Sequence, residues 1–323
     1  MKNIVELAAF LQGRAMKNIL ITGGSGMLGS AFKKLLPDAL YISSKDYDLR
    51  DRNQVDEMYA TYKPEYVIHL ASRVGGVLAN MQNLGDFYFD NIMMNTNVLD
   101  AAKEHKVKKV LSCLSTCVYP DKVEYPLTEK QIHNGPPHSS NYTYAYTKRM
   151  IDIQSRAYRE QFGCNFISMS PNNLFGEHDN FDLEDSHVIP AMIRKIYEAK
   201  QAGEDVTMWG DGTPLREFTY IDDICNISLF LLEAYDDPEP INVGTTGERT
   251  IKEIAEKIAS YFNFEGNIAW DIYKPKGQHR KPSDNSKLLE FGWKEEDYTD
   301  FDEALHKTCQ WFEDNYPNVR GVR

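Results

Sequence analysis

The 323-residue sequence contains no long apolar run. No uninterrupted stretch approaches the roughly 18 apolar residues that a membrane-spanning helix requires. Near the N-terminus, the apolar residues 7–11 form only a short run behind Glu6, which makes a poor secretory signal. We therefore expect no membrane partner, while a hydrophobic content of 42% is enough to build a sizeable core.

The sequence is also poor in cysteine and in positive charge. Its five cysteines are odd in number and lack the paired Cys-x-x-Cys spacing of a zinc or redox site, so we expect no metal and a reducing, cytoplasmic setting. The formal net charge of −12 argues against a nucleic-acid partner, because phosphate backbones require a basic face. A nucleotide remains compatible, since it needs only a local cationic pocket.

The N-terminal region contains a short repeat. Residues 1–4 read Met-Lys-Asn-Ile, and the same four residues recur at 16–19. The repeat predicts that the fold begins at Met16 and that residues 1–15 are an N-terminal extension. A short added helix is the alternative.

Short β-type runs alternate with helical stretches between residues 16 and 171. The expected strands are 18–22, 39–42, 66–70, 107–114 and 165–170, and the expected helices are 27–36, 53–62, 80–105 and 143–162. Regular alternation with near-continuous apolar strands predicts an α/β fold, namely a doubly wound parallel sheet of the Rossmann type with helices on both faces. Residues 16–171 are therefore the expected nucleotide-binding domain.

The pattern loosens after residue 171. A loop-rich stretch at 172–187 precedes expected helices at 188–202, 222–234, 251–261 and 301–315 and expected strands at 206–209 and 216–220. We expect a smaller C-terminal α/β lobe, residues 172–323, that binds substrate against the first domain; the prediction leaves open that the chain crosses back to the sheet. The segment 120–141 is long for a connection, which indicates an active-site loop.

A glycine-rich turn follows the first expected strand. It reads Gly-x-x-Gly-x-x-Gly and leads into a helix, which allows the backbone to turn tightly and approach a pyrophosphate at the helix N-terminus. The residues predicted to contact a dinucleotide here are Gly23, Gly24, Ser25, Gly26, Met27, Leu28 and Gly29.

The end of the second expected strand bears on which dinucleotide binds. Ser43, Ser44 and Lys45 offer hydroxyls and a cation to a 2′-phosphate, which favours NADP(H), whereas Asp46 keeps NAD(H) open. Further residues predicted to line the cofactor are Asp51, which can contact the adenine, and Leu70 and Ala71 at the end of the third strand.

A second cluster of polar residues follows the fourth expected strand. Ser115 and Cys117 are two apart, so an extended backbone directs both side chains to one face. Tyr144 and Lys148 are four apart in a helical stretch and also share a face. A nearby ammonium and a positively charged nicotinamide lower a tyrosine's pKa from about 10. Tyr144 can then donate a proton to a carbonyl oxygen as hydride arrives, with Ser115 as a second hydrogen bond.

These motifs resemble the extended short-chain dehydrogenase/reductases, and within them the epimerase-reductases that act on GDP-4-keto-6-deoxy-D-mannose. The resemblance covers nearly everything from Met16 onward, and its narrowest motifs are Ser115-Thr-Cys117 and Ser186-His-Val-Ile-Pro190. It implies an NADPH-dependent enzyme that inverts carbons 3 and 5 of a GDP-sugar and reduces its 4-ketone to give GDP-L-fucose. It also implies a homodimer formed through the run 80–105 and the helix that holds Tyr144.

The resemblance assigns a task to Cys117, which plain reduction does not require. Cys117 would be the base and His187 the acid of the epimerisations, because an ordinary thiol and imidazole have pKa values of about 8.5 and 6.5. The implied cofactor contacts extend to Lys148, Asn172, Asn173, Leu174 and His187. The implied substrate contacts are Val188, Lys195, Trp209, Arg216 and Lys276, the last standing where the family commonly has an acidic residue.

Two alternative functions stay open on the sequence. Another nucleotide-sugar epimerase or reductase of the extended family would need no acid/base pair beyond Tyr144 and Lys148. A non-catalytic NADP-binding sensor or scaffold is the second alternative. Proteins of that class commonly lack the Tyr/Lys pair, so its presence argues against them.

Overall fold

A computed structural model describes residues 18–274 and 279–322 of the chain. The predicted extension at residues 1–15 and the predicted substrate residue Lys276 lie outside these residues. In the part of the chain that the structure describes, no helix is both long and apolar enough to cross a membrane.

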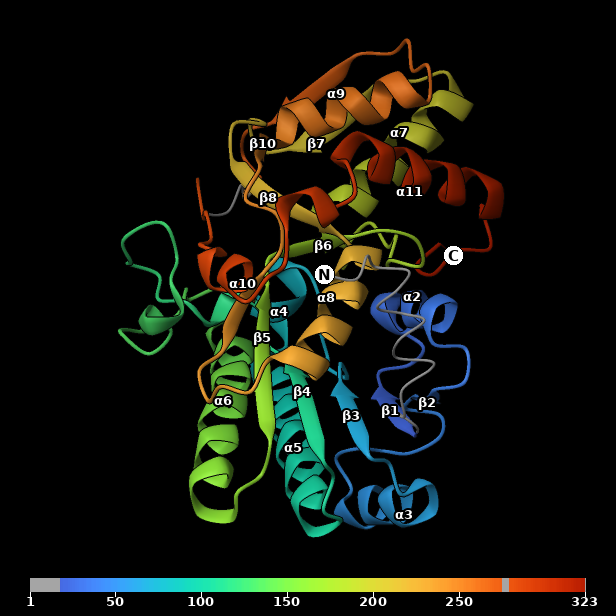
Figure 1. Cartoon of the computed structure of the whole chain (residues 1–323). Coiled ribbons are helices and arrows are strands. Elements are labelled where there is room, and N and C mark those ends of the chain that lie inside the picture. The colour runs from blue at the N-terminus through green and yellow to red at the C-terminus, as the bar shows by residue number, and fades with distance from the viewer. Residues whose placement is uncertain (1–17, 275–278, 323) are drawn as a thin grey trace.

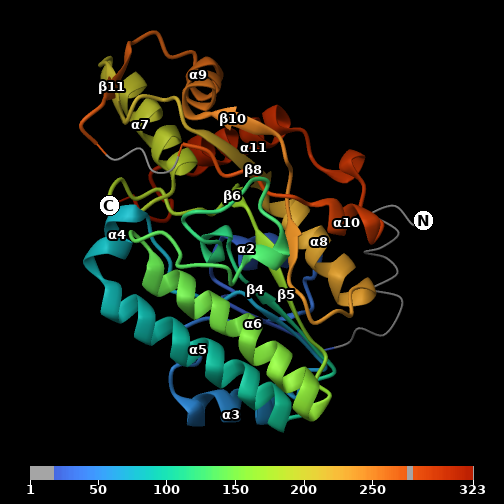
Figure 2. The ribbon, with the colours of Figure 1, turned by 90° about the vertical axis from the view of Figure 1, so that its left-hand side faces the viewer.

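The main sheet has six parallel strands in the order β2-β1-β3-β4-β5-β9. The strands are β1 (Ile19–Thr22), β2 (Leu40–Ile42), β3 (Tyr66–His69), β4 (Lys109–Cys113), β5 (Phe166–Pro171) and β9 (Ile241–Val243). Helices α2 (Met27–Leu35) and α8 (Ile221–Ala234) cover one face (Figure 1). Helices α3 (Arg52–Tyr62), α5 (Leu84–Glu104) and α6 (Tyr142–Phe162) cover the other, with α5 and α6 side by side (Figure 2). The predicted doubly wound α/β fold is confirmed.

Both faces of this sheet are buried, which explains why its strands read as continuous apolar runs. Successive residues alternate between two cores: Ile21 and Ile68 pack with α2 and α8, while Leu20 and Val67 pack with α3 and α5. Parallel strands covered by helices on both faces require this pattern.

The strand register aligns the carboxyl ends of neighbouring strands in the main sheet. Thr22 pairs with His69, and Cys113 pairs with Met169, two residues before Pro171 ends β5. The carboxyl ends of the strands therefore meet at one edge, where ligands bind in open α/β sheets.

A second group of elements lies beyond that edge. It contains the sheet β10-β8-β6, built from β6 (Asn173–Phe175), β8 (Leu215–Tyr220) and β10 (Glu248–Thr250), and the pair β7 (Val206–Trp209) and β11 (Ile268–Asp271). Its helices are α7 (Val188–Ala202), α9 (Ile251–Tyr261) and α11 (Phe301–Asn315) (Figure 1). The short helix α10 (Ser286–Glu290) packs on β9 of the main sheet instead. Between these elements the chain crosses back, because β9 pairs with β5 and α8 packs on α2.

The single helix predicted at 80–105 is wrong. The chain forms α4 (Val77–Gln82) and then α5, with a break at Asn83. The Asn83 backbone leaves the helical region, and its side-chain Nδ2 donates to Ala79 O at 2.9 Å. A local side-chain bond of this kind competes with the helical ladder, which the apolar periodicity of the segment does not reveal.

A buried lysine ties the sheet to α8. Lys109 on β4 donates through Nζ to the carbonyl oxygens of Leu231, Leu232 and Tyr235 at 3.1, 2.8 and 2.5 Å. Burial lowers the pKa of Lys109 to about 8. The last carbonyls of a helix need such donors, so Lys109 caps α8 from the neighbouring strand.

We expect Lys109→Ala to lower the free energy of unfolding by about 2–4 kcal/mol, because three buried carbonyls lose their donor and a cavity remains. Chemical denaturation measures this change. The control is Lys108→Ala, which removes only an exposed ion pair to Glu65 and should cost under about 1 kcal/mol. Equal losses in the two variants would contradict the capping role.

Candidate active site

The glycine-rich turn forms a cradle that no larger residue fits. Gly23 has a φ of 73°, and a Cβ added to it would lie 2.9 Å from Ala71 N. A Cβ on Gly29 would lie 2.6 Å from Gly23 O, so α2 packs directly on the turn. No acidic residue occupies the first turn of α2, and its N-terminus is free to face negative charge. These residues fit the pyrophosphate of a dinucleotide and bring the predicted positions 70 and 71 beside it.

The turn after β2 separates its carboxylate from its cation. Asp46 accepts hydrogen bonds from Ser43 N at 2.8 Å and Ser43 Oγ at 2.6 Å. Both bonds lower the pKa of Asp46, and the bond from the Ser43 hydroxyl has the larger effect. Ser44 and Lys45 are exposed beside it. The carboxylate that kept NAD(H) open is thus bonded within its own turn. Asp51 caps α3 by accepting from Asn53 N, and its adenine contact stays a prediction.

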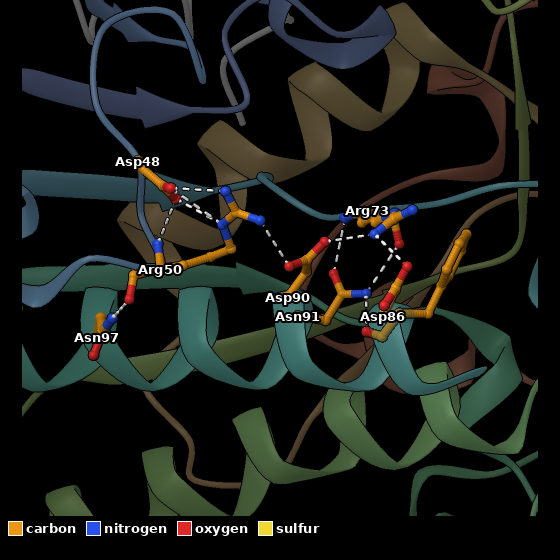
Figure 3. A network of polar contacts seen from close by, with 8 residues as sticks. Asp48, Arg50, Arg73, Asp86, Asp90, Asn91 and Asn97 are labelled. Atoms are coloured by element: carbon orange, nitrogen blue, oxygen red, sulfur yellow. Dashed lines mark hydrogen bonds and ion pairs between the residues drawn. The ribbon is translucent and has the colours of Figure 1, made fainter. Parts of the chain in front are cut away.

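An ion-pair network fixes two cofactor loops to α5. Arg50, from the loop after β2, donates to Asp90 Oδ1 at 2.9 Å, and Arg73, from the loop after β3, donates to Asp90 Oδ2 at 2.8 Å (Figure 3). Burial raises the pKa of Asp90, but the hydrogen bonds from both arginines outweigh it and hold the pKa below its usual range. The sequence missed this network because its members are far apart in the chain.

A buried polar chain links the sheet to the helix that carries Tyr144 and Lys148. Thr22 Oγ1 and His69 Nδ1 are 2.8 Å apart, His69 Nε2 and Asn95 Oδ1 are 3.0 Å apart, and Asn95 Nδ2 donates to Thr147 O at 3.3 Å. Burial, aided by the Lys148 charge, lowers the pKa of His69 to about 4. A neutral His69 therefore joins β1, β3, α5 and α6 beside the predicted site.

The predicted Tyr144 and Lys148 share one face of α6. Lys148 is buried, with Nζ donating to Cys113 O at 2.7 Å and lying 5.8 Å from the centre of the Tyr144 ring. Burial raises the pKa of Tyr144, and the nearby thiols Cys117 and Cys113 raise it further. The protein's own groups therefore raise the pKa of Tyr144, whereas the sequence predicted that a nearby ammonium and a charged nicotinamide would lower it. The phenol is protonated at neutral pH and is able to donate.

The extended backbone that would direct Ser115 and Cys117 to one face holds at Ser115 but not at Cys117. Strand β4 ends at Cys113, and residues Thr116–Val118 form a 3-10 turn. Ser115 Oγ accepts from Cys117 N at 3.3 Å and thereby caps this turn. Cys117 nevertheless reaches the site, because the turn folds it back towards Tyr144, with which it interacts electrostatically. The contact of Ser115 with a carbonyl oxygen stays a prediction.

Lys281 is a site residue that sequence reasoning missed. Burial lowers the pKa of Lys281, while the Cys117 thiol raises it and the Arg216 charge lowers it, so the three groups lie together. Two residues on, Ser283 donates through N and Oγ to the buried carboxylate of Glu217. Ser283 and Glu217 are 66 residues apart in the chain, and no local sequence pattern predicts their contact.

His187 is the N-cap residue before α7 and is exposed. Its loop is held against the loop after β3 by the bond from Gly76 N to Asp185 O at 3.0 Å. Asp179 is a second missed residue: it is buried with Oδ2 unpaired, burial raises its pKa, and the His187 charge lowers it. Among the described residues, no hydrogen bond joins Cys117 to His187, and their pairing across a substrate stays a prediction.

The predicted substrate residues form two groups. Lys195 Nζ lies 5.4 Å and Lys274 Nζ 5.3 Å from the centre of the exposed Trp209 ring. Burial lowers the pKa of Lys195, and Lys274 lowers it further. Val188 is the first residue of α7, the helix that also carries Lys195. Arg216 lies with Lys281 near Cys117, and burial lowers its pKa.

Asn172, Asn173 and Leu174 continue from β5 into β6. Asn172 Nδ2 donates to Thr245 O at 2.7 Å, and Asn173 Nδ2 donates to Glu217 O at 2.8 Å. The second lobe thus holds both amides at the edge where the strands end. Their contacts with a cofactor stay predictions.

Comparisons with known proteins show the family to which the chain belongs. The chain belongs to the NAD dependent epimerase/dehydratase family, whose family model matches residues 19–244. The GDP-L-fucose synthase of Dictyostelium discoideum is 41% identical over 313 residues, covering 94% of this chain and 98% of that protein. That of Escherichia coli K12 is 34% identical over 320 residues, covering 94% and 99%.

Solved structures give the same result. The crystal structure of a GDP-L-fucose synthetase from Naegleria fowleri bound to NADP matches with a TM-score of 0.89 and 41% identity, over 95% of this chain and 96% of that one. A UDP-glucose 4-epimerase from Thermotoga maritima, at 22% identity and a TM-score of 0.80, shares the fold. The resemblance indicated by the sequence motifs is confirmed.

Because the folded pKa of His69, about 4, lies below the ordinary value of 6.5, the unfolded chain binds the proton first as pH falls. We expect the protein to lose up to about 3 kcal/mol of stability through this residue between about pH 6.5 and 4. Urea unfolding across this range should show a shallower pH dependence in His69→Gln than in the wild type. Substitution of the exposed His306 is the control and should leave the dependence unchanged.

Proposed function

We propose that the protein is a bifunctional epimerase-reductase that converts GDP-4-keto-6-deoxy-D-mannose to GDP-L-fucose with NADPH. The relatives named above support the activity. The observation that carries the proposal is the Cys117 thiol, which lies with Tyr144 and Lys148 in one site. Carbonyl reduction alone needs no such thiol, whereas inversion beside a ketone needs a base.

Epimerisation uses the residues of the 3-10 turn and α6. Cys117 removes a proton from a carbon beside the 4-ketone, while hydrogen bonds from Ser115 and Tyr144 stabilise the enolate oxygen. His187 returns a proton to the opposite face of the sugar.

Reduction follows at the same carbonyl. When bound, NADPH supplies the hydride for the 4-ketone. Tyr144 donates the proton to the carbonyl oxygen, which its raised pKa allows because the phenol is protonated beforehand. Lys148, held by Cys113 O, then stabilises the phenolate that is left.

The GDP part lies against the second lobe. Trp209 offers a flat, exposed ring to the guanine, flanked by the Lys195 and Lys274 ammonium groups. Arg216 suits the diphosphate, since guanidinium groups bind phosphate oxygens in pairs. The cytoplasm is the proposed location, consistent with five unpaired cysteines.

A homodimer through α5 and α6 is part of the proposal. Apolar and aromatic residues are exposed along α6 at Tyr142, Tyr146, Met150 and Ile153, and on α5 at Phe89. The spacing of the four residues on α6 puts them on one face of that helix, and an exposed apolar face marks an association site. A second copy of the same helix pair is its natural partner, because this face is the same in both subunits.

Incubation with GDP-4-keto-6-deoxy-D-mannose and NADPH in deuterated water tests the reaction. We expect GDP-L-fucose with deuterium at carbons 3 and 5, because each inversion takes a proton from solvent. Mass spectrometry and NMR identify the product. A reduced sugar without deuterium at either carbon would contradict the epimerase activity.

We expect Cys117→Ser to slow exchange at carbons 3 and 5 by about 10²-fold or more, since a serine hydroxyl is far less acidic than a thiol and supplies almost no ionised base near neutral pH. Cys164 lies between the end of α6 and the start of β5, at the opposite end of α6 from Tyr144. Its substitution should leave exchange unchanged and is the matched control. Full-rate exchange in Cys117→Ser would overturn the assigned role.

A charged substitution among the exposed apolar residues of α6 tests the homodimer. We expect Ile153→Glu to convert the dimer to a monomer, because two carboxylates would be buried without partners. Light scattering coupled to size-exclusion chromatography measures the mass. A monomeric wild-type protein at micromolar concentration would contradict the proposal, and a substitution of the exposed Lys252 on α9 is the control.

A further inference from the structure

We propose that Asn141 is a positioning residue for Cys117: its side-chain amide orients the sulfur and stabilises the thiolate. The inference rests on the proposed function, in which that thiolate is the base of the epimerisation. Asn141 touches neither the carbonyl nor the hydride, and it acts only through Cys117.

The contact itself is direct. Asn141 Nδ2 donates to Cys117 Sγ at 3.0 Å. A hydrogen bond from a neutral N–H group is stronger to a charged acceptor than to a neutral one, so this contact favours the thiolate over the thiol. It also restricts the rotation of the Cys117 side chain.

The fold holds Asn141 in place for this contact rather than for helix capping. Asn141 is the N-cap residue of α6, with its backbone carbonyl accepting from Ala145 N at 3.0 Å and its backbone N donating to His138 O at 3.2 Å. An asparagine at this position ordinarily accepts from an amide of the first turn. Asn141 makes no such side-chain bond, and its Oδ1 is buried without a partner in the described structure.

The charges that face Cys117 come from two other parts of the fold. The thiol raises the pKa of Lys148 on α6 and of Lys281 on the segment before α10, against the larger lowering by burial in each case. The Tyr144 phenol faces it as well. Both ammonium groups favour a thiolate, but neither makes a hydrogen bond to the sulfur in the described residues. Asn141 therefore supplies the directional contact.

Two substitutions test the contact while keeping the helix start, because Ser, Asp and Asn are similarly good N-cap residues. Asn141→Ser removes the donor that reaches the sulfur. Asn141→Asp keeps the size of the side chain and replaces the donor with a carboxylate, which repels a thiolate. Thermal unfolding confirms that both variants are folded.

The first measurement is the rate at which iodoacetamide alkylates Cys117, followed by peptide mass spectrometry. At pH 7 we expect a rate about tenfold lower in Asn141→Ser than in the wild type and lower still in Asn141→Asp. At about pH 10, above the ordinary thiol pKa of about 8.5, the rates of Asn141→Ser and wild type should converge. Equal rates at pH 7 in all three proteins would overturn the proposal.

The second measurement is exchange at carbons 3 and 5 of the keto sugar in deuterated water, with NADP⁺ in place of NADPH so that no reduction follows. We expect exchange to slow about tenfold in Asn141→Ser and to recover as pH rises, which a purely structural defect would not do. Slower alkylation with unchanged exchange would also overturn the positioning role. Absence of exchange in the wild type would instead contradict the proposed function, while alkylation would still decide the contact.

Discussion

The parallel pairing of β1, β3, β4 and β5 is the constraint on which the site depends. Because the strands run in one direction, their carboxyl ends meet at one edge, and the glycine-rich turn, the Ser115–Cys117 turn and the start of β6 lie there together. The buried chain from Thr22 through His69 and Asn95 then fixes α6 against that edge. The glycine-rich turn and the helix that carries Tyr144 and Lys148 are thereby joined by neutral, hydrogen-bonded groups.

Burial sets the electrostatics of the active site. Lys148 and Lys281 each have a pKa lowered by burial, and the same Cys117 thiol opposes that lowering in both. The thiolate left when Cys117 gives up its proton is therefore stabilised by two desolvated cations and one amide donor. One cluster of residues can in this way serve proton removal and, through Tyr144, proton delivery to the carbonyl.

Much of the fold could be predicted because its elements carry local signals. The helices at 188–202, 251–261 and 301–315 were placed correctly from apolar periodicity, and the glycine turn from its spacing. The break at Asn83 and the 3-10 turn at Cys117 were not, because each depends on a side-chain hydrogen bond that competes with regular structure. Short strands such as β6 and β10 carry too few residues for a pattern.

The sequence by itself determined the class of fold and the residue types of the reaction, since glycine spacing, Tyr-x-x-x-Lys and Ser-x-Cys are local features of the chain. Only the tertiary structure decided which distant groups surround Cys117. Lys281 lies near Cys117 because Ser283, two residues later, is hydrogen-bonded to Glu217. Asn141 contacts Cys117 because the start of α6 lies beside the turn after β4. Contacts of this kind depend on burial and on long-range packing, and neither leaves a periodic trace in the sequence.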